Sequence, residues 1–578
     1  MASETAETPA KKGIDFYPFA YALYTENSAD YCWNCFSERK NLKICQGCRT
    51  AWFCNESCIN LGWKDHKVEC GALKKSRTMP DIEVRILGRI VTRHKDITTG
   101  ADKEDPNFYL NRSSGRQIMD IWAHVDKIRN DNYAITKFDK IYQQLVAFYG
   151  EDNLLDKETV FQLHCRDFIN RHAISDKHYM KEIGKGLYLD LCAYDHSCAP
   201  NTIYVCDGIV ATLCALNSSV NLADRSKTFY SYIELVLAKQ QRRKLLKDTW
   251  YFDCECDRCK DNDEHILTAM KCPHCEPEHA QTIPIFGNQP YKNPETQQII
   301  CPKCNQEVTQ KEVLDALSAT RFITDLLDKQ ELEQMKRSLA FDFATELIGR
   351  FKKFLPQCNV SYCKLIEAAI RFVDPQDHQK ILELYREAEA CVRICFPQNH
   401  PALAFHLRNI GLEYYRLERF DDAIKYLEEA AGMFEFVMPV DHPLAKSSRA
   451  VLATVKVKAA ERNNEPAEKK DEPSHDQINA PPEDTPAPEK ALPDDTNKEA
   501  GAASEVPDAQ LPEKETLQDK DEEKRSPADA DVSVEAKETV QPPPALKPEP
   551  TVATREVCRQ IAQGFLKDDD DELPELMD

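Results

Sequence analysis

The fold of this chain is most legible in residues 32–70, which have the sequence CWNCFSERKNLKICQGCRTAWFCNESCINLGWKDHKVEC. Cysteine and histidine occur there in four pairs, each separated by two or three residues. Zinc requires four thiolate or imidazole ligands at tetrahedral angles, and such a gap lets one turn present two ligands to the same ion. The stretch therefore predicts two zinc sites, with the ligands Cys32, Cys35, Cys45, Cys48, Cys54, Cys58, His66 and Cys70.

Two further cysteine groups follow this stretch. Cys254, Cys256 and Cys259 offer only three ligands, so their site needs a fourth from elsewhere in the fold, and Cys198 is a candidate. The other group consists of two Cys-x-x-Cys knuckles and predicts a closed zinc ribbon, with the ligands Cys272, Cys275, Cys301 and Cys304. Because no group leaves a position open for water, we expect structural zinc, about four ions per chain.

The other cysteines lie mostly in apolar or helical runs, where a buried and unreactive thiol is the default expectation. They are Cys165, Cys192, Cys206, Cys214, Cys358, Cys363, Cys391, Cys395 and Cys558. The N-terminus lacks the apolar core of a signal peptide, and no run approaches the roughly 18 apolar residues that span a bilayer. We therefore expect a protein of the nucleus and cytoplasm, without a membrane segment, whose cysteines are reduced.

The chain is too long for one hydrophobic core, because its 578 residues exceed the roughly 250–300 at which a single core stops growing. From about Asn463 onward it is rich in Glu, Lys, Asp, Pro and Ala, and this composition predicts a disordered tail. The tail carries about −19 of the formal net charge of −22. It serves solubility or attracts a basic partner such as a histone. A helical period from Val552 to Lys567 suggests a short docking helix within it.

Helical periodicity dominates between about residues 311 and 460 and predicts an α-helical domain. Residues 407–414, Leu-x-x-Ile-Gly-x-x-Tyr, fit the tetratricopeptide (TPR) helix–turn–helix pattern. A related tripeptide recurs at a spacing of 42, as Asn399-His400-Pro401 and Asp441-His442-Pro443. Stacked helix pairs of this kind form a concave face that either binds peptide or acts as a lid.

A segment rich in glycines and turn formers lies between the first two cysteine groups. It contains GKGLY at residues 184–188, YDHSCAPN at residues 194–201 and a strand-like run from Thr202 to Cys206. These features predict an irregular β-sheet.

The ligand spacing of residues 31–70, with Trp52-Phe53 before Cys54 and Trp63 before His66, resembles that of the MYND zinc finger. The His-Ser-Cys-x-Pro-Asn string, the Tyr-Ile-Glu at residues 232–234 and the FDCEC string at residues 252–256 look like a SET domain with its cysteine-rich post-SET segment. A MYND finger before that ensemble is specific to the SET-and-MYND (SMYD) lysine methyltransferase family. The resemblance covers about Phe16 to Leu452.

The resemblance implies an α+β multidomain fold, in which a β-rich SET domain carries an inserted MYND finger and a post-SET zinc site and is followed by a TPR-like helical domain. It also implies that the finger pairs interleave and that Cys198 completes the site of Cys254, Cys256 and Cys259. The expected parts are an N-terminal SET segment (1–30), the MYND finger (31–70), a helical SET insert (71–170), the core SET (171–240), the post-SET segment (241–262), a zinc ribbon-like insert (263–310), the helical domain (311–460) and the acidic tail (461–578).

The implied activity is methylation of histone or non-histone protein lysines with S-adenosylmethionine. Asp195 and His196 would hold the cofactor, Phe252 would form an aromatic wall, and Tyr232 would lie beside the transferred methyl group. The lysine amine must be neutral and aligned with the methyl group, which a narrow apolar channel and a tyrosine hydroxyl achieve. Aromatic walls also attract the methylated ammonium.

Four features depart from the family pattern. Family members open with a Gly-x-Gly loop that helps to hold the cofactor, whereas this chain begins close to residues 19–23 (FAYAL), so the loop is lost or the chain start is truncated. Asp195 replaces an asparagine, and ADRS at residues 223–226 replaces an acidic lead into the tyrosine strand. Trp250 occupies the place of a second channel tyrosine, and the adjacent Tyr251 should point elsewhere.

The alternative is a protein without catalysis, in which an inactive SET frame carries partner-binding modules. In that case the MYND finger, which in its family binds proline-rich peptides, and the TPR-like helices bring proteins together. Direct DNA binding is disfavoured, because the folded part lacks net basic character and the zinc groups lack the spacing of C₂H₂ fingers.

Overall fold

The computed structural model describes residues 13–76, 78–101, 116–179, 181–261, 263–285, 293, 295–439 and 441–464. The described residues belong to one compact unit. The predicted tail lies outside the described residues except for residues 461–464, which end helix α14 (Pro443–Asn464). The predicted docking helix at Val552–Lys567 and Cys558 also lie outside them.

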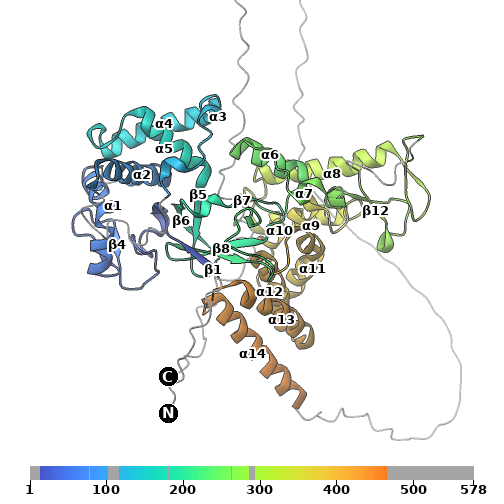
Figure 1. The fold of residues 1–578 in the computed structure, drawn as a ribbon. Helices are drawn as coiled ribbons and strands as arrows, with labels where there is room; N and C mark the ends of the chain where they lie inside the picture. The colour runs from blue at the N-terminus through green and yellow to red at the C-terminus, as the bar shows by residue number, and fades with distance from the viewer. Residues whose placement is uncertain are drawn as a thin grey trace, which may run out of the picture. The chain divides into compact units, whose positions relative to one another are not determined.

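Helices and strands are mixed along the described part of the chain (Figure 1). Two three-stranded antiparallel sheets form the centre of the N-terminal half, in the orders β2-β6-β5 and β1-β9-β8. Their strands are β1 (Gly13–Phe16), β2 (Ala20–Leu23), β5 (Arg171–Ser175), β6 (Glu182–Leu187), β8 (Thr202–Asp207) and β9 (Val210–Ala215). Two short strands, β7 (Asp195–His196) and β10 (Phe229–Tyr230), pair in parallel and place Tyr230 opposite His196.

Glycines in β6 let its neighbours approach closely. A Cβ atom on Gly184 would lie 2.4 Å from the carbonyl oxygen of Ala22, and one on Gly186 would lie 2.8 Å from the ring of Tyr188. Real Cβ atoms do not make contacts this short, so the GKG motif at residues 184–186 is required for the packing of β2 and of Tyr188 against β6.

Three small antiparallel hairpins accompany the cysteine groups. They are β3 (Lys43–Ile44) with β4 (Trp52–Phe53), β11 (Met270–Lys271) with β12 (Thr282–Ile283), and β13 (Ile299–Ile300) with β14 (Glu307–Val308).

Five helices accompany the sheets in the N-terminal half. They are α1 (Glu56–Ser76), α2 (Ile82–Thr99), α3 (Val125–Arg129), α4 (Asn132–Tyr149) and α5 (Lys157–Asn170). Helix α2 packs on β2 and β6 and also on α4 and α5. Side-chain capping fixes two of the helix starts, because Asp131 accepts hydrogen bonds from the first turn of α4 and Asp156 from that of α5.

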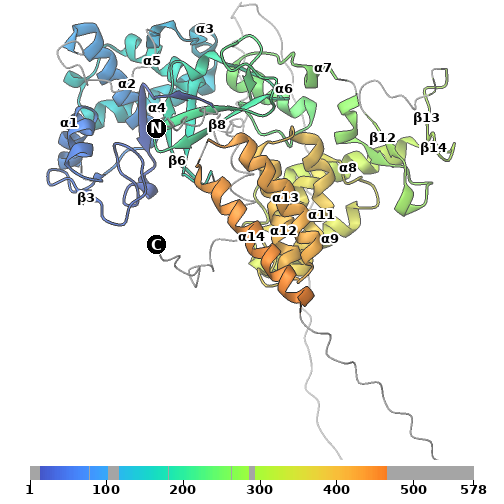
Figure 2. The ribbon, with the colours of Figure 1, turned by 60° about the horizontal axis from the view of Figure 1, so that its bottom comes forward.

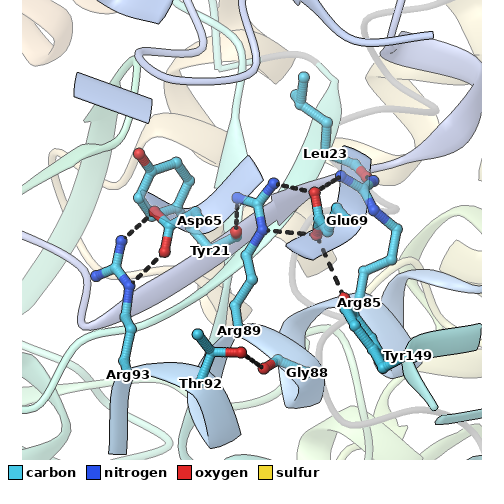
Figure 3. Close-up of polar contacts among 10 residues, drawn as sticks. All are labelled: Tyr21, Leu23, Asp65, Glu69, Arg85, Gly88, Arg89, Thr92, Arg93 and Tyr149. Atoms are coloured by element: carbon cyan, nitrogen blue, oxygen red, sulfur yellow. Dashed lines mark hydrogen bonds and ion pairs between the residues drawn. The ribbon is translucent and has the colours of Figure 1, made fainter. Parts of the chain in front are cut away.

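Helix α2 presents three buried arginines to strand β2, and we call them the arginine ladder (Figure 3). Arg85 donates to the carbonyl oxygen of Leu23 at 2.8 Å and Arg89 donates to that of Tyr21 at 2.6 Å. Arg93 donates to the carbonyl oxygen of Phe19. Residues four apart lie on one face of a helix, and carbonyl groups two residues apart lie on one edge of a strand. The arginines therefore meet every second carbonyl group of the strand over two helical turns.

Helix α1 supplies the carboxylates that neutralise the arginine ladder. Glu69 is 1% exposed and pairs with Arg85 and Arg89, while Asp65 pairs with Arg93 (Figure 3). A buried arginine is tolerated only with such compensation.

Between residues 310 and 464 the structure describes seven helices. They are α8 (Gln310–Asp328), α9 (Arg337–Phe351), α10 (Val360–Ile370), α11 (His378–Cys395), α12 (Pro401–Arg416), α13 (Phe420–Val437) and α14. Consecutive helices from α9 to α14 pack against one another, and Figure 2 shows α12, α13 and α14 side by side. None of the helices that the structure describes has the length and hydropathy needed to cross a bilayer.

The recurring tripeptide starts two of these helices. His400 Nδ1 accepts from the backbone N–H of Ala402 at 3.1 Å, and His442 Nδ1 accepts from that of Leu444 at 3.3 Å. The residue before each histidine has a positive φ, 65° in Asn399 and 67° in Asp441. The repeat is therefore a helix-start motif.

Helices α6 (Lys239–Trp250) and α7 (Asp257–Lys260) connect the sheets to the helical part. Arg258 on α7 donates to the carbonyl oxygens of Cys198 at 3.0 Å, Leu235 at 3.1 Å and Cys395 at 3.1 Å. One guanidinium group thus joins a cysteine of the sheet region to the end of α11.

Candidate functional site

The finger brings its eight predicted ligands together in two interleaved sets. In each set the four ligand atoms lie within 4.8 Å of one another. Cys35 Sγ is 3.6 Å from Cys54 Sγ, and Cys48 Sγ is 3.5 Å from His66 Nε2. A tetrahedral zinc with Zn–S bonds of about 2.3 Å separates its sulfurs by about 3.8 Å, so the spacing fits zinc. The sets are Cys32, Cys35, Cys54 and Cys58, and Cys45, Cys48, His66 and Cys70.

The downstream cysteines form two more sets with the same spacing. Cys198 Sγ lies 3.6 Å from Cys259 Sγ and 4.0 Å from Cys254 Sγ, so Cys198 stands with the three-cysteine group. In the other set the knuckles face each other, with Cys272 and Cys304 sulfurs 3.7 Å apart. These sets are Cys198, Cys254, Cys256 and Cys259, and Cys272, Cys275, Cys301 and Cys304.

The protein favours thiolate at some of these positions. Burial raises the pKa of the Cys48 thiol, but hydrogen bonds from His66 and from the backbone of Ala51 and Thr50 outweigh it and lower the pKa to about 6. Zinc binds the thiolate, so a lowered thiol pKa favours metal binding at neutral pH.

His196 connects the Cys198 set to Tyr232. Its Nδ1 accepts from the backbone N–H of Tyr232 at 3.0 Å, and its Nε2 lies 3.2 Å from Cys198 Sγ. Burial lowers the pKa of His196 to about 3, so the ring is neutral and its single proton is on Nε2. The ring therefore donates to the sulfur and holds the backbone of Tyr232 in place, a supporting contact of the kind that metal ligands usually have.

Tyr232 lines a narrow pocket of about 60 Å³. Its hydroxyl donates to the carbonyl oxygen of Tyr194 at 2.9 Å. Burial, followed by the charge of Asp195, raises the pKa of this hydroxyl, so it is neutral at physiological pH. The pocket is lined by Ile169, Asn170, Arg171, His172, Ala173, Tyr179, Cys192, Pro200, Thr202, Ile203, Tyr204, Tyr230, Ser231, Tyr232, Trp250 and His400.

Trp250 forms a wall of this pocket. Its ring lies 5.6 Å from that of Tyr232, and its indole N–H donates to the carbonyl oxygen of Ile169 at 3.0 Å. Tyr251 has a left-handed backbone, with φ of 60°, and turns away so that its hydroxyl donates to Asp131 at 3.2 Å. An indole thus replaces the tyrosine hydroxyl that the family resemblance led us to expect.

The two remaining predicted cofactor residues lie beside His196 rather than in the pocket lining. Asp195 is exposed, and the half-buried ring of Phe252 lies 6.2 Å from that of His196. Another aromatic group is found near Tyr251, where His124 is 6.1 Å from Tyr251 and stacks on Trp122, which is 73% exposed.

Several pocket residues were missed by the sequence reasoning. His172, Tyr204 and Tyr230 come from three different strands, and their rings pack together. Tyr230 alone has a signal in the sequence. It lies two residues before Tyr232 in the FYSY run at residues 229–232, and residues two apart on a strand point to the same face. Cys192 also lines the pocket and is half-buried, whereas the other cysteines outside the four sets are buried among the described residues.

The comparisons with known proteins match the finger and find lysine methyltransferases among the relatives. The MYND finger family model matches residues 32–70. N-lysine methyltransferase SMYD2-A of Danio rerio is 28% identical over 277 residues, which are 46% of this chain and 59% of that protein. Histone-lysine N-methyltransferase SMYD3 of Homo sapiens is 28% identical over 278 residues, 46% of this chain and 60% of that protein.

A third relative, human N-lysine methyltransferase SMYD2, is 26% identical over 278 residues, 46% of this chain and 58% of that protein. The chain thus spans about 60% of the length of the curated relatives it matches. The finger match, its zinc-compatible ligand sets and these relatives together support a protein of the SET-and-MYND (SMYD) family.

Proposed function

We propose that the chain is an S-adenosylmethionine-dependent protein-lysine N-methyltransferase that acts on histone or other protein lysines. The observation that carries the proposal is the placement of Tyr232, whose ring lines the narrow aromatic pocket and whose backbone is held by His196 beside the Cys198 set. The relatives named as lysine methyltransferases support it.

The pocket suits a lysine side chain. Its aromatic rings, including Tyr204, Tyr230, Tyr232 and Trp250, give the aliphatic stem an apolar wall and exclude water. Because the Tyr232 hydroxyl donates its proton to Tyr194, its oxygen is left as an acceptor for an amine N–H. An apolar wall lowers the pKa of an amine, and a fixed acceptor orients it.

S-adenosylmethionine would supply the methyl group, carried on a sulfonium sulfur. The residues present fit such a cation, because the exposed Asp195 carboxylate offers a negative charge and Phe252 offers a ring face. We assign cofactor contacts to Asp195, His196, Tyr232 and Phe252. Both ring nitrogens of His196 are already engaged, so its contribution is through the backbone and through its hold on Tyr232.

We further propose zinc at each of the four cysteine sets, a SET domain built from the sheets of β1, β2 and β5–β10, a zinc ribbon over β11–β14 and a TPR-like domain over α8–α14. The proposed partners are protein lysines, including histone lysines, and the proposed locations are the nucleus and cytoplasm.

One observation favours a second function, binding of partner peptides by the finger. Leu61 and Trp63 on α1 are each 43% exposed, although large apolar side chains on a metal-stabilised finger usually pack inward. An apolar surface of this kind suits a proline-rich peptide, and the adaptor function would persist without catalysis.

Titration calorimetry of the full chain with S-adenosylmethionine, followed by mass spectrometry of core histones incubated with both, tests the enzyme proposal. We expect saturable cofactor binding and a methyl mass added to lysine. Tyr232→Phe should remove most of the methylation, whereas the matched control Tyr426→Phe, in the helical domain, should not. No binding at millimolar cofactor would leave only the adaptor function.

A further inference from the structure

A histidine and a tyrosine form a hydrogen bond within the pocket. His172 Nε2 lies 2.7 Å from the hydroxyl oxygen of Tyr230, and both residues are 5% exposed. His172 comes from β5 and Tyr230 from β10, and both line the pocket that Tyr232 lines. The Tyr230 and Tyr232 rings are 5.1 Å apart. The pair therefore lies beside the residue proposed to orient the amine.

Methyl transfer to lysine requires a proton acceptor. A lysine amine in solution has a pKa of about 10.4, so at neutral pH it must lose a proton before its lone pair can attack. No aspartate or glutamate occurs among the described residues that line the pocket. The Arg171 guanidinium is paired with Glu83 and Asp167.

The other titratable groups of the lining are poor acceptors. Burial lowers the pKa of His400 to about 3, and its Nδ1 already accepts from the backbone of Ala402. Burial raises the pKa of the Cys192 thiol to about 12, and burial likewise keeps the Tyr230 phenol neutral by raising its pKa well above the usual value. An imidazole reached through the Tyr230 hydroxyl is the remaining acceptor that the geometry offers.

We propose that Tyr230 and His172 form a two-step proton relay for the target lysine, an inference that rests on the proposed methyltransferase function. The N–H bond of the ammonium breaks, its electron pair stays on nitrogen, and the proton passes to the Tyr230 oxygen. The hydroxyl proton of Tyr230 passes to His172 Nε2. The result is a neutral amine and an imidazolium. Tyr230 touches the substrate, and His172 acts through Tyr230 as a positioning residue.

The surroundings of His172 suit this transfer. The positive charge moves within one pocket, so the net charge of the buried region does not change. The ring of Tyr188, directly after β6, and those of Tyr204 on β8 and Tyr230 on β10 pack around the imidazole, with ring centroids 5.3–5.8 Å away. The nearby charged residues on the same sheet are Arg171, paired with Glu83 and Asp167, and Lys185 on β6, opposite Ala173.

The relay is tested by methyl transfer to core histones by the full chain at pH 7 to 10, with S-adenosylmethionine affinity measured in parallel. We expect Tyr230→Phe and His172→Ala to lower kcat/KM at pH 7 about 10²-fold without changing cofactor affinity. The deficit should shrink as pH rises toward 10, because the amine then arrives already deprotonated. Added imidazole should restore part of the activity of His172→Ala but not of Tyr230→Phe.

The matched control is Tyr204→Phe, which alters a tyrosine of the same pocket whose hydroxyl donates to the carbonyl oxygen of Ala173. It should show no pH-dependent deficit. If the wild type methylates but the Tyr230→Phe deficit is absent or constant with pH, the relay is overturned and the proposed function stands. If the wild type binds no cofactor, both are overturned.

Discussion

Glu69 accepts two hydrogen bonds of 2.8 Å from Arg89, one from Nε and one from Nη2, while the remaining nitrogen of Arg89 reaches the carbonyl oxygen of Tyr21. Glu69 precedes Cys70 of the second finger set, and Tyr21 lies on strand β2. The Glu69–Arg89 ion pair is therefore one of the buried contacts that join the finger to the central sheet.

Glu69→Gln should destabilise the protein strongly. It removes the charge that compensates Arg85 and Arg89, and leaving a buried charge unpaired costs about 3–5 kcal/mol. Urea unfolding measures the loss. The control is Glu158→Gln, because Glu158 pairs with Arg129 on the surface, where each side chain is about half exposed and solvent screens the pair, so its loss should change stability little. Equal effects of the two changes would contradict the role of the buried pair.

Cys198→Ser should remove one zinc ion. Four ligand sets predict four ions in the wild type, and the substitution takes a thiolate from one set, so metal analysis should find about three. The same change should loosen Tyr232, because His196 loses the sulfur that it contacts. Cys192→Ser, which alters a pocket cysteine outside the sets, should retain all four ions; a loss of zinc there would show that the sets are wrongly drawn.

Gly411→Ala should weaken the contact between α12 and α13. An added Cβ would lie 2.7 Å from Leu427 Cγ, so the helices or the leucine must move, at a cost of about 1–3 kcal/mol. Gly432→Ala on α13 is the matched control, since its Cβ meets nothing within 4 Å. Alanine is the better helix former, so thermal unfolding should show a gain of about 0.5–1 kcal/mol there. Two losses of similar size would rule out close approach as the reason for Gly411.

Acid should destabilise the protein partly through Glu83. Burial alone would raise its pKa, but Arg171 and Lys137 outweigh burial and lower it from 4.5 to about 2. A lowered pKa in the folded state means that the stabilisation is complete above about pH 4.5 and is lost as pH falls toward 2, and its size is about 3 kcal/mol.

Urea unfolding between pH 3 and 7 tests the role of Glu83. Glu83→Gln should be less stable than the wild type at pH 7, and the difference should shrink toward pH 3. A Glu56→Gln variant, which alters an exposed glutamate of α1, should follow the wild type. A constant difference between Glu83→Gln and the wild type would refute the titration of Glu83 as the cause.

The part of the site that could be predicted from the sequence was mostly the zinc ligands, and it was predicted from their spacing. A Cys-x-x-Cys pair is local, so its two sulfurs meet in any fold that forms the turn, and the structure groups the sixteen predicted ligands into four sets. The local sequence does not determine which two pairs bind the same ion, because this depends on how the chain folds. The interleaving of the finger and the partnership of Cys198 came from the family resemblance.

The pocket and the arginine ladder were beyond such reasoning. His172, Tyr204 and Tyr230 meet because strands of three different sheets lie close together, and only the FYSY run gives a local sign of one of these residues. Arginines at positions 85, 89 and 93 have the spacing of a solvated helix face, yet each is at most 9% exposed. Only the position of β2 beside that face decides that they are buried.

The arginine ladder also determines what strand β2 can do. An outer strand with open carbonyl groups is a template for a strand from another molecule, the route to domain swapping and fibrils. Here three guanidinium groups occupy alternate carbonyls along that edge, those of Phe19, Tyr21 and Leu23. Any invading strand would have to displace buried ion pairs first. The sheet is thereby protected from edge-to-edge aggregation without a further strand to cover it.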